Sequence, residues 1–323
     1  MNLPKIGITL GDPGGIGPEI VLKALSLKDS LPRAQYIIFG SSFVIEEEKL
    51  AMGLKMDIQT FEKKESISPS LFETENSLET LKKGSSSKEN GEASFLFFKK
   101  ALEEAKRGTI DALVTAPISK NSWNLAGLRW PGHTEFLSQT YPHAIMAFWS
   151  ERIKVALFSH HIPLKAAIEK IKKDALLDFF LSLNHNIEKI KPEAFHFLVA
   201  GLNPHAGEES LLGSEEEEEI FPAVKQAQRE GMRINGPFPP DVVFRSALNK
   251  PDKIVIALFH DQGLIPFKLE AFEKGVNLTL GLPFVRTSPD HGTAFDIAGK
   301  GIANPESMVE AIKLAYELSP PPF

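Results

Sequence analysis

The chain has 323 residues, 42% of them hydrophobic, which is enough to bury a large core in one big α/β unit or in two domains. The formal net charge of -6 and the lack of a Lys/Arg run argue against a nucleic-acid partner. Because the sequence contains no cysteine, disulfides, thiolate nucleophiles and cysteine-ligated zinc are excluded. A metal would therefore need histidine and carboxylate ligands.

The first residues lead directly into an apolar strand pattern at Ile6–Leu10, without the basic and apolar segments of a signal peptide. No stretch approaches the roughly 18 consecutive apolar residues of a membrane-spanning helix. We therefore expect a soluble cytoplasmic protein that has no membrane partner.

Short apolar runs alternate with longer helical patterns along the chain, which is typical of βαβ units and a mostly parallel sheet. The predicted fold class is α/β. In chain order, strands are expected at Lys5–Leu10, Gln35–Phe39, Ala112–Thr115, Ile153–Ser159, Phe195–Ala200 and Lys253–Phe259. The spacing of apolar residues predicts helices over Ser94–Arg107 and Leu164–Asn184.

A further helix is predicted to begin at Ser214, because Glu217 three residues later completes a capping box, and to end at Gly231. The five glutamates at 215–219 would then face solvent at the positive end of the helix dipole, and we favour this reading over a metal site. Ser85–Gly91 is predicted to be a polar loop, to which the sequence assigns no role.

Two lobes around a cleft are expected. The chain is predicted to cross between the lobes near Ser119 and to return near Phe267. This gives a first α/β lobe of residues 1–120 and 268–323, and a second of residues 121–267.

Three histidines, His161, His205 and His260, each follow the carboxyl end of a predicted strand. Ligands of open parallel sheets bind outside these ends, so three imidazoles far apart in sequence would converge there. Neutral imidazoles suit Zn²⁺ or a similar divalent ion and leave a position open for substrate. Taken singly, each is more readily a buried or capping histidine, and the residues alone do not separate His161 from His160. Asp261 would either orient a metal-bound His260 or cap a turn.

The glycine-rich turn at Gly11–Glu19 lies between the first strand and a helical pattern. It matches neither the phosphate loop nor the dinucleotide fingerprint, so a close approach to a ligand and a purely structural turn are equally favoured. His133 and Thr134 open a helical pattern after a proline and an aromatic residue. Substrate contact is one interpretation of this segment, and helix capping by Thr134 is the other.

The stretch from His260 to His291 contains Lys268, Asn277 and Arg286, the groups that a phosphate or carboxylate would require. Scattered solvated charges would look similar. His291, in the polar loop that follows Asp290, would be either a cofactor contact or a local cap.

Nearly end to end, the chain resembles the 4-hydroxythreonine-4-phosphate dehydrogenase family. Six segments in family order carry the resemblance: Gly11–Pro13, Gly132–Phe136, Gly201–Glu208, Asn235–Pro237, His260–Gly263 and Asp290–Ala294. The resemblance implies two α/β lobes around a cleft, as in the isocitrate and isopropylmalate dehydrogenases, assembled as a homodimer. Such a fold would explain the missing glycine fingerprint.

The resemblance also implies roles for individual residues. His161, His205 and His260 match the metal ligands, in a site built across the dimer interface in the second lobe, and this matching selects His161 over His160. The substrate-binding positions fall on His133, Thr134, Lys268, Asn277 and Arg286. Candidates for cofactor contacts are Asp241, Asp290 and His291, and no general base is assigned.

The implied reaction is the oxidation of 4-phosphooxy-L-threonine by NAD or NADP with Zn²⁺, Mg²⁺ or Co²⁺. Its product, 2-amino-3-oxo-4-phosphooxybutanoate, decarboxylates to 3-amino-2-oxopropyl phosphate for pyridoxal phosphate biosynthesis. The alternatives are a 4-phospho-D-threonate or erythronate dehydrogenase and a non-catalytic metal or phosphometabolite-binding protein. Two departures from the family pattern stand out. Gly14 replaces an alanine and should leave the turn intact, whereas Val242 replaces a threonine and puts cofactor contacts there in doubt.

Overall fold

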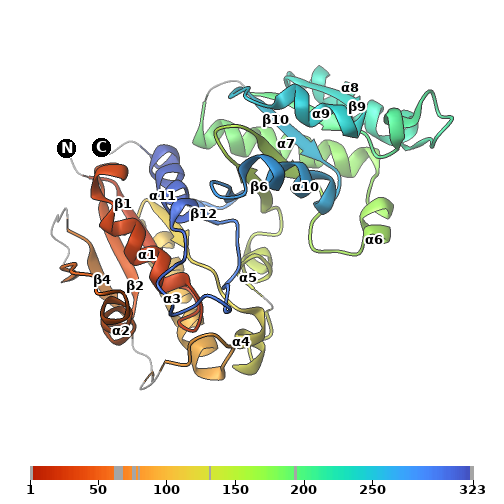
Figure 1. Ribbon diagram of the computed structural model, residues 1–323. Coiled ribbons are helices and arrows are strands. Elements are labelled where there is room, and N and C mark those ends of the chain that lie inside the picture. Colours follow the sequence, from red (N-terminus) through yellow and green to blue (C-terminus); the bar gives the residue numbers. More distant parts are fainter. Residues whose placement is uncertain are drawn as a thin grey trace. The chain divides into compact units, whose positions relative to one another are not determined.

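The computed structural model describes residues 3–61, 68–74, 78, 81–130, 132–192 and 195–320. The chain forms two compact α/β units, shown in Figure 1, which confirms the predicted fold class. Unit 1 comprises Met1–Pro142 and Leu282–Phe323, and unit 2 comprises His143–Gly281. Within the described part of the chain, no helix is both long and apolar enough to cross a membrane.

Unit 1 is built on six parallel strands in the order β3-β4-β2-β1-β5-β12. Their bounds are β1 Lys5–Thr9, β2 Gln35–Gly40, β3 Gln59–Thr60, β4 Ser70–Glu73, β5 Ala112–Thr115 and β12 Val285–Pro289. All residues of β2, β5 and β12 are buried, as in a parallel sheet whose two faces are both covered.

The helices of unit 1 are α1 Gly17–Ser26, η1 Lys28–Ser30, α2 Ser42–Met52, α3 Lys88–Lys106, α4 Lys120–Leu125, α5 His133–Thr140 and α11 Glu306–Leu318. Helix α3 packs on β1, β2 and β5, and α11 packs on β5 and β12. Helix α3 begins six residues before its predicted start, because the Ser87 hydroxyl accepts a hydrogen bond from the Asn90 backbone N–H and caps it. The second half of the predicted Ser85–Gly91 loop is therefore helical.

The sheet of unit 2 has the strand order β11-β6-β7-β10-β8-β9. The strands are β6 Ile145–Trp149, β7 Lys154–Leu157, β8 His196–Ala200, β9 Ile234–Phe238, β10 Lys253–Ala257 and β11 Val276–Leu280. Strand β6 runs antiparallel to both of its neighbours, whereas β7, β10, β8 and β9 are mutually parallel. The helical segments are α6 Leu164–Glu169, α7 Lys173–Ile190, η2 Pro204–Gly207, η3 Glu216–Ile220, α8 Phe221–Arg229, α9 Pro240–Ala247 and α10 His260–Ala271.

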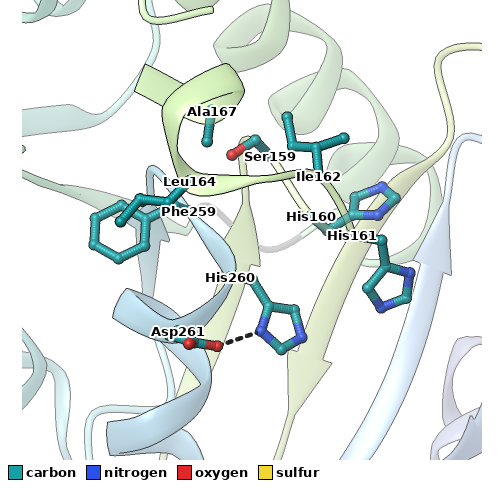
Figure 2. Close-up of a pocket in the computed structure, with 9 residues that line it drawn as sticks. All are labelled: Ser159, His160, His161, Ile162, Leu164, Ala167, Phe259, His260 and Asp261. Atoms are coloured by element: carbon teal, nitrogen blue, oxygen red, sulfur yellow. Dashed lines mark hydrogen bonds and ion pairs between the residues drawn. The ribbon is translucent and has the colours of Figure 1, made fainter. Parts of the chain in front are cut away.

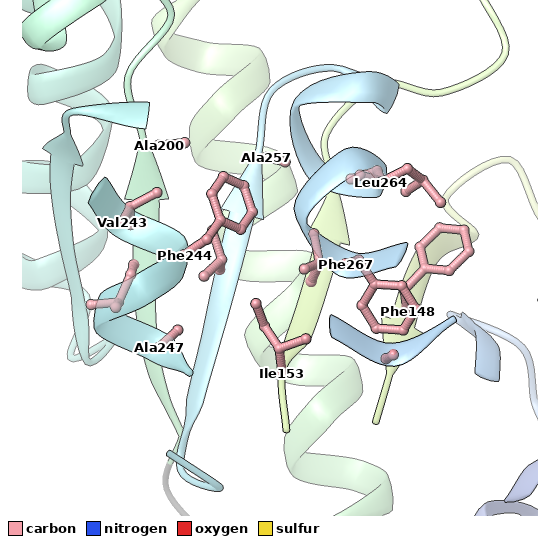
Figure 3. Packing of buried hydrophobic residues seen from close by; sticks show 14 of the residues in the cluster. Phe148, Ile153, Ala200, Val243, Phe244, Ala247, Ala257, Leu264 and Phe267 are labelled. Carbon is pink, nitrogen blue, oxygen red and sulfur yellow. The ribbon is translucent and has the colours of Figure 1, made fainter. Parts of the chain in front are cut away.

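One core cluster of unit 2 lies between the sheet and helices α9 and α10 (Figure 3). Phe244 of α9 and Phe267 of α10 are among its largest side chains. Gly263 lets α10 approach the sheet closely, because a Cβ at that position would come within 2.7 Å of Leu157 Cδ2 and 3.0 Å of Ala257 Cβ. This packing fixes the start of α10 beyond the carboxyl end of β10.

Two sequence predictions differ from the observed fold. The helix predicted over Leu164–Asn184 is two helices, α6 and α7, separated at Lys170–Lys172, where the Ile171 side chain is buried. The units divide at residues 142/143 and 281/282, rather than at 120/121 and 267/268. The reasons are that α4 packs on α3 of unit 1 and that β11 pairs with β6 of unit 2.

Candidate active site

The three predicted metal ligands all lie beyond the carboxyl ends of neighbouring strands in unit 2. The strands β7, β10 and β8 are adjacent and parallel, and His161, His260 and His205 follow them respectively. Because the three strands are parallel, the segments that follow them, and that carry the three histidines, all lie at the carboxyl end of the sheet.

Two of these histidines line one pocket of about 260 Å³ (Figure 2). The ring centres of His161 and His260 are 5.6 Å apart. The full lining is Ser159, His160, His161, Ile162, Leu164, Ala167, Phe259, His260 and Asp261. His205 is not part of the lining, and in the described part of this single chain no three His, Asp or Glu side chains gather closely enough to hold a metal ion. The structure therefore pairs His161 with His260 and leaves His205 outside the pocket.

His260 is the first residue of α10, and its ring is held by its neighbour. Its Nδ1 lies 2.7 Å from Asp261 Oδ1, an interaction drawn in Figure 2. A carboxylate at Nδ1 fixes the ring and its tautomer, leaving Nε2 available as a ligand. Asp261 itself lies in the first turn of α10, one residue after His260.

Two residues before His161, a side-chain hydrogen bond connects the segments that follow two neighbouring strands. The buried Ser159 hydroxyl donates a hydrogen bond of 2.7 Å to the Leu258 carbonyl, which joins the segment after β7 to the segment after β10. The backbone of His161 has φ 45°, a left-handed conformation that costs a non-glycine residue free energy and that is found most often at functional sites. The neighbouring His160 also lines the pocket, so the geometry by itself does not separate the two.

The loop that carries His205 is held by Glu216, a residue for which the sequence predicted only contact with solvent. Glu216 Oε1 accepts hydrogen bonds of 2.7 Å from the backbone N–H groups of Leu202 and Asn203, and its Oε2 accepts one of 2.8 Å from Asn203 Nδ2. The helix predicted from Ser214 is present: Glu215 is helical, the Glu218 N–H donates to the Ser214 carbonyl, and the helical run continues through η3 and α8 to Arg229. Helical spacing from Glu216 to the buried Ile220 and Ala223 was the signal that could have placed this carboxylate inside.

Gln262 is a second residue that the sequence analysis missed. Its side-chain oxygen accepts from the Leu258 N–H, and its Nε2 donates to the Gly201 carbonyl, both at 2.7 Å. It thereby links the ends of β10 and β8.

In unit 1, His133 and Arg286 form a buried pair. Arg286 Nη2 donates to Thr115 Oγ1 at 2.6 Å and lies 3.3 Å from His133 Nδ1. Burial lowers the pKa of His133 well below 6.5, and the Arg286 charge lowers it further, so the imidazole is neutral at pH 7. Burial lowers the pKa of Arg286 to about 10, so the guanidinium stays protonated. Nδ1 must then accept from Arg286, and the proton resides on Nε2.

This buried pair leaves a donor for a ligand. His133 Nε2 is buried and has no hydrogen-bond partner within the described chain. A cation beside an unused N–H group is what an anionic substrate group needs. Thr134 lies inside α5 and does not cap it, because the residue before the helix is Gly132 and makes no side-chain cap. The other predicted substrate residues, Lys268 on α10 and Asn277 on β11, belong to unit 2.

The candidate cofactor residues are spread over both units. Asp241 and the half-exposed Val242 lie in the first turn of α9 in unit 2. In unit 1, the Asp290 backbone N–H donates to Ser307 Oγ, and His291 Nδ1 lies 3.0 Å from the Gly292 carbonyl, a local contact. These contacts leave the cofactor assignments as predictions.

The glycine-rich turn is closely packed around Gly14. The Gly14 N–H donates to Asp12 Oδ1 at 2.8 Å, and burial raises the pKa of this carboxyl group. A Cβ on Gly14 would lie 2.4 Å from Asn90 Nδ2 and 2.7 Å from the Lys82 carbonyl oxygen. The turn is thus formed with Gly14, as expected, and an alanine at this position would require the segment at 82–90 to shift.

Comparisons with known proteins agree with the resemblance. The family described as pyridoxal phosphate biosynthetic protein PdxA matches residues 32–315. A 4-hydroxythreonine-4-phosphate dehydrogenase of Aquifex aeolicus is 41% identical, covering 97% of this chain and 98% of the relative. A protein of Halalkalibacterium halodurans named as a D-threonate 4-phosphate dehydrogenase is 38% identical, covering 98% and 97%.

Solved structures give the same result for the fold. The crystal structure of a 4-hydroxythreonine-4-phosphate dehydrogenase from Burkholderia phymatum has a TM-score of 0.84 at 36% identity, covering 99% of each chain. A β-decarboxylating dehydrogenase from Thermococcus kodakarensis, 16% identical, covers 97% of this chain and 83% of its own at a TM-score of 0.52, which confirms the expected dehydrogenase-like fold. Because the family match spans most of the chain and relatives about 40% identical align nearly end to end, the chain belongs to the PdxA family.

Proposed function

We propose that the protein is a metal-dependent, NAD(P)-linked dehydrogenase that oxidises 4-phosphooxy-L-threonine in pyridoxal phosphate biosynthesis. Family membership and the names of relatives about 40% identical support the reaction. The structural observation that carries the proposal is the His161–His260 pair, whose rings share one pocket beyond the carboxyl ends of parallel strands. The product, 2-amino-3-oxo-4-phosphooxybutanoate, then loses CO₂ to give 3-amino-2-oxopropyl phosphate.

The residues present fit a divalent metal. Two imidazoles with metal–nitrogen bonds of about 2.1 Å on one tetrahedral ion have ring centres roughly 5 Å apart, close to the observed 5.6 Å. Asp261 supplies the carboxylate that commonly orients a metal-bound imidazole. Imidazole ligands favour Zn²⁺ or Co²⁺ over Mg²⁺. We propose His161, His205 and His260 as the ligands.

A divalent ion held by the three histidines would lower the pKa of the substrate hydroxyl, and nicotinamide would accept the hydride. The residues of the chain bind and orient the substrate. Arg286 provides a charge that persists at neutral pH, and the His133 Nε2–H provides a fixed donor, so both suit a phosphate or carboxylate group. We propose that Thr134, Lys268 and Asn277 complete the substrate site.

We further propose that the enzyme is a homodimer and that the second copy completes the metal site. Helix α10, which starts with His260, exposes Ile265, Leu269 and Phe272 to 61%, 81% and 75%. Their spacing of four and three residues makes one apolar stripe on the helix. Such a stripe is typical of a surface covered by a partner. A second copy lying there would stand next to the pocket of His161 and His260.

The test is to replace His205 with alanine and to measure bound metal together with NADH or NADPH formation. We expect both to be lost, because His205 is the third imidazole. A variant that kept its full metal content and full turnover would overturn the proposal.

A second candidate substrate is 4-phospho-D-threonate, favoured by the 38% identical relative named for that activity. Both substrates carry a hydroxyl group beside a phosphate arm, and they differ in an amino or a hydroxyl group at C2. Parallel assays of the two substrates with each nicotinamide cofactor and each metal would separate them. We expect the higher kcat/KM with 4-phosphooxy-L-threonine. Metal binding with no turnover of either substrate would identify a binding protein instead.

A further inference from the structure

The Glu216 side chain is only 2% exposed, although it lies in a run of five glutamates whose next two members are exposed. We propose that Glu216 is a positioning residue: its carboxylate fixes the loop 201–207 so that His205 is presented to the metal. This inference rests on the proposed function, in which His205 is a metal ligand.

The loop needs external support because its backbone is strained. His205 has φ 54° and Ala206 φ 55°, and three further non-glycine residues at 208–210 also have positive φ. Such left-handed conformations are unfavourable for non-glycine residues, and they persist only where the surrounding structure determines them. The Ala206 side chain does not favour this conformation over an extended one. Within the loop, the Ala206 N–H donates to the Asn203 carbonyl at 3.1 Å, so contacts that hold Asn203 also support this conformation.

Glu216 accepts three hydrogen bonds from the first part of this loop. Its two oxygens accept from Leu202 N–H, Asn203 N–H and Asn203 Nδ2, all at 2.7–2.8 Å and all within three residues of His205. An ionised carboxylate is acceptor-only, so it can serve three donors at once. Hydrogen bonds to a charged acceptor are about twice as strong as neutral ones.

The space around the carboxylate is fitted to it. A Cβ on Gly207 would lie 2.9 Å from Glu216 Oε2, and one on Gly201 would lie 3.1 Å from Oε1. Glycines at both ends of the loop therefore let the backbone close around the carboxylate.

The loop is also tied to the helix that carries His260. Gln262, two residues after His260, donates to the Gly201 carbonyl immediately before the residues that Glu216 holds. Glu216 and Gln262 thus hold the same short segment from two elements, η3 and α10. If the Glu216 contacts were lost, His205 could relax from its strained backbone conformation, while His161 and His260 would stay in place.

The experiment compares Glu216→Gln with Glu217→Gln, a matched change of an exposed neighbour in the same run. Co²⁺ is titrated into the metal-free full-length protein and followed by its visible absorption, a readout independent of turnover. We expect Glu216→Gln to weaken Co²⁺ binding by about 10- to 100-fold, as is usual for partners that orient metal ligands. Its activity should return when Co²⁺ is in excess, and Glu217→Gln should bind as the wild type does.

Asn203→Ala, which removes the Nδ2 contacts with Glu215 and Glu216 but keeps both backbone contacts with Glu216, should weaken binding by a smaller factor, roughly 10-fold or less. It tests the proposal independently if circular dichroism shows Glu216→Gln to be unfolded. Wild-type affinity in a folded Glu216→Gln, with metal lost in His205→Ala, would overturn the positioning role and leave the proposed function intact. Metal retained in His205→Ala would instead overturn the proposed function.

Discussion

His133 lies in a buried environment, beside a cation, that disfavours a charged imidazole. Its ring centre is 4.4 Å from that of Phe98 and 5.4 Å from that of Trp123, and Arg286 faces its Nδ1. A protonated ring here would lose hydration and meet a second cation. The neutral state is thus built into the fold, and it lets one nitrogen accept from Arg286 while the other donates to a ligand.

This arrangement makes stability depend on pH. The pKa of His133 is lowered in the folded state relative to 6.5 when unfolded, so the stabilising contribution is present above pH 6.5. It is lost as the pH falls below 6.5, because only the unfolded chain then takes up the proton. Between about pH 6.5 and 5, the free energy of unfolding should fall by up to about 1.4 kcal/mol per pH unit from this group.

Urea unfolding across that range would measure the effect. His133→Asn, which keeps an acceptor for Arg286, should remove this part of the slope, whereas His185→Asn, at an exposed position, should keep it. An unchanged slope in His133→Asn would contradict the assignment.

Gly14 offers a second test with single residues. Because its Cβ would collide with Asn90 Nδ2 and the Lys82 carbonyl oxygen, Gly14→Ala should lower the free energy of unfolding by about 1–3 kcal/mol. The control is Gly292→Ala, where a Cβ would meet no atom within 4 Å. Equal free energies of unfolding of the two variants in urea would show that the 82–90 segment can shift to accommodate the methyl group without loss of stability.

Among the elements, α10 is the one that presents most of the proposed chemistry. It begins with His260, carries Lys268, and exposes the stripe of Ile265, Leu269 and Phe272 on its outer face. Replacing the three stripe residues with Glu, Lys and Glu should give a monomer in sedimentation, because charges would be buried in the proposed interface.

The same variant should bind Co²⁺ much more weakly, although all three histidines are retained. Leu50→Glu, at a residue of α2 that is 78% exposed, is the control and should remain dimeric with normal metal affinity. A monomer with undiminished affinity would show that one chain suffices for the site.

The elements also show how far sequence patterns reach. Continuous apolar runs predicted β1, β2, β5, β8 and β10 to within two residues at either end, because buried parallel strands are apolar on both faces. Strand β12 was not predicted, because Arg286 and Ser288 give it the polar pattern of a loop, although all five of its residues are buried. Strand β9 contains Gly236 and Pro237, which interrupt the pattern of a strand.

At the scale of the whole molecule, local motifs located the candidate residues but not their partners. The strand ends predicted the histidines, since a ligand position beyond a parallel strand is a local feature. The Glu216 contacts with Leu202 and Asn203 and the Gln262 contact with Gly201 join residues 13 or more positions apart, and no spacing rule reports such contacts. The unit boundaries were missed for the same reason, as they depend on how α4 packs and on which strand β11 joins.

If two copies share the metal site, binding and assembly are thermodynamically linked. Anything that binds the dimer more tightly than the monomer favours the dimer by mass action. We expect the fraction of chains with bound Co²⁺ to fall on dilution, in parallel with the dimer measured by sedimentation. A fraction that did not depend on protein concentration through the dissociation range would contradict a shared site.

The side-chain hydrogen bonds of Glu216 and Gln262 beyond β8 and β10 also affect local unfolding of this part of the sheet. The amide hydrogens of Leu202, Asn203 and Leu258 lie outside regular structure, yet each is donated to Glu216 or Gln262. Loop amides usually exchange with solvent through small local fluctuations. Here, exchange of these three amide hydrogens would require the Glu216 and Gln262 hydrogen bonds between neighbouring strand ends to break together. Deuterium uptake at these three amides should therefore be as slow as in the strands, so that the segment unfolds with the sheet and not before it.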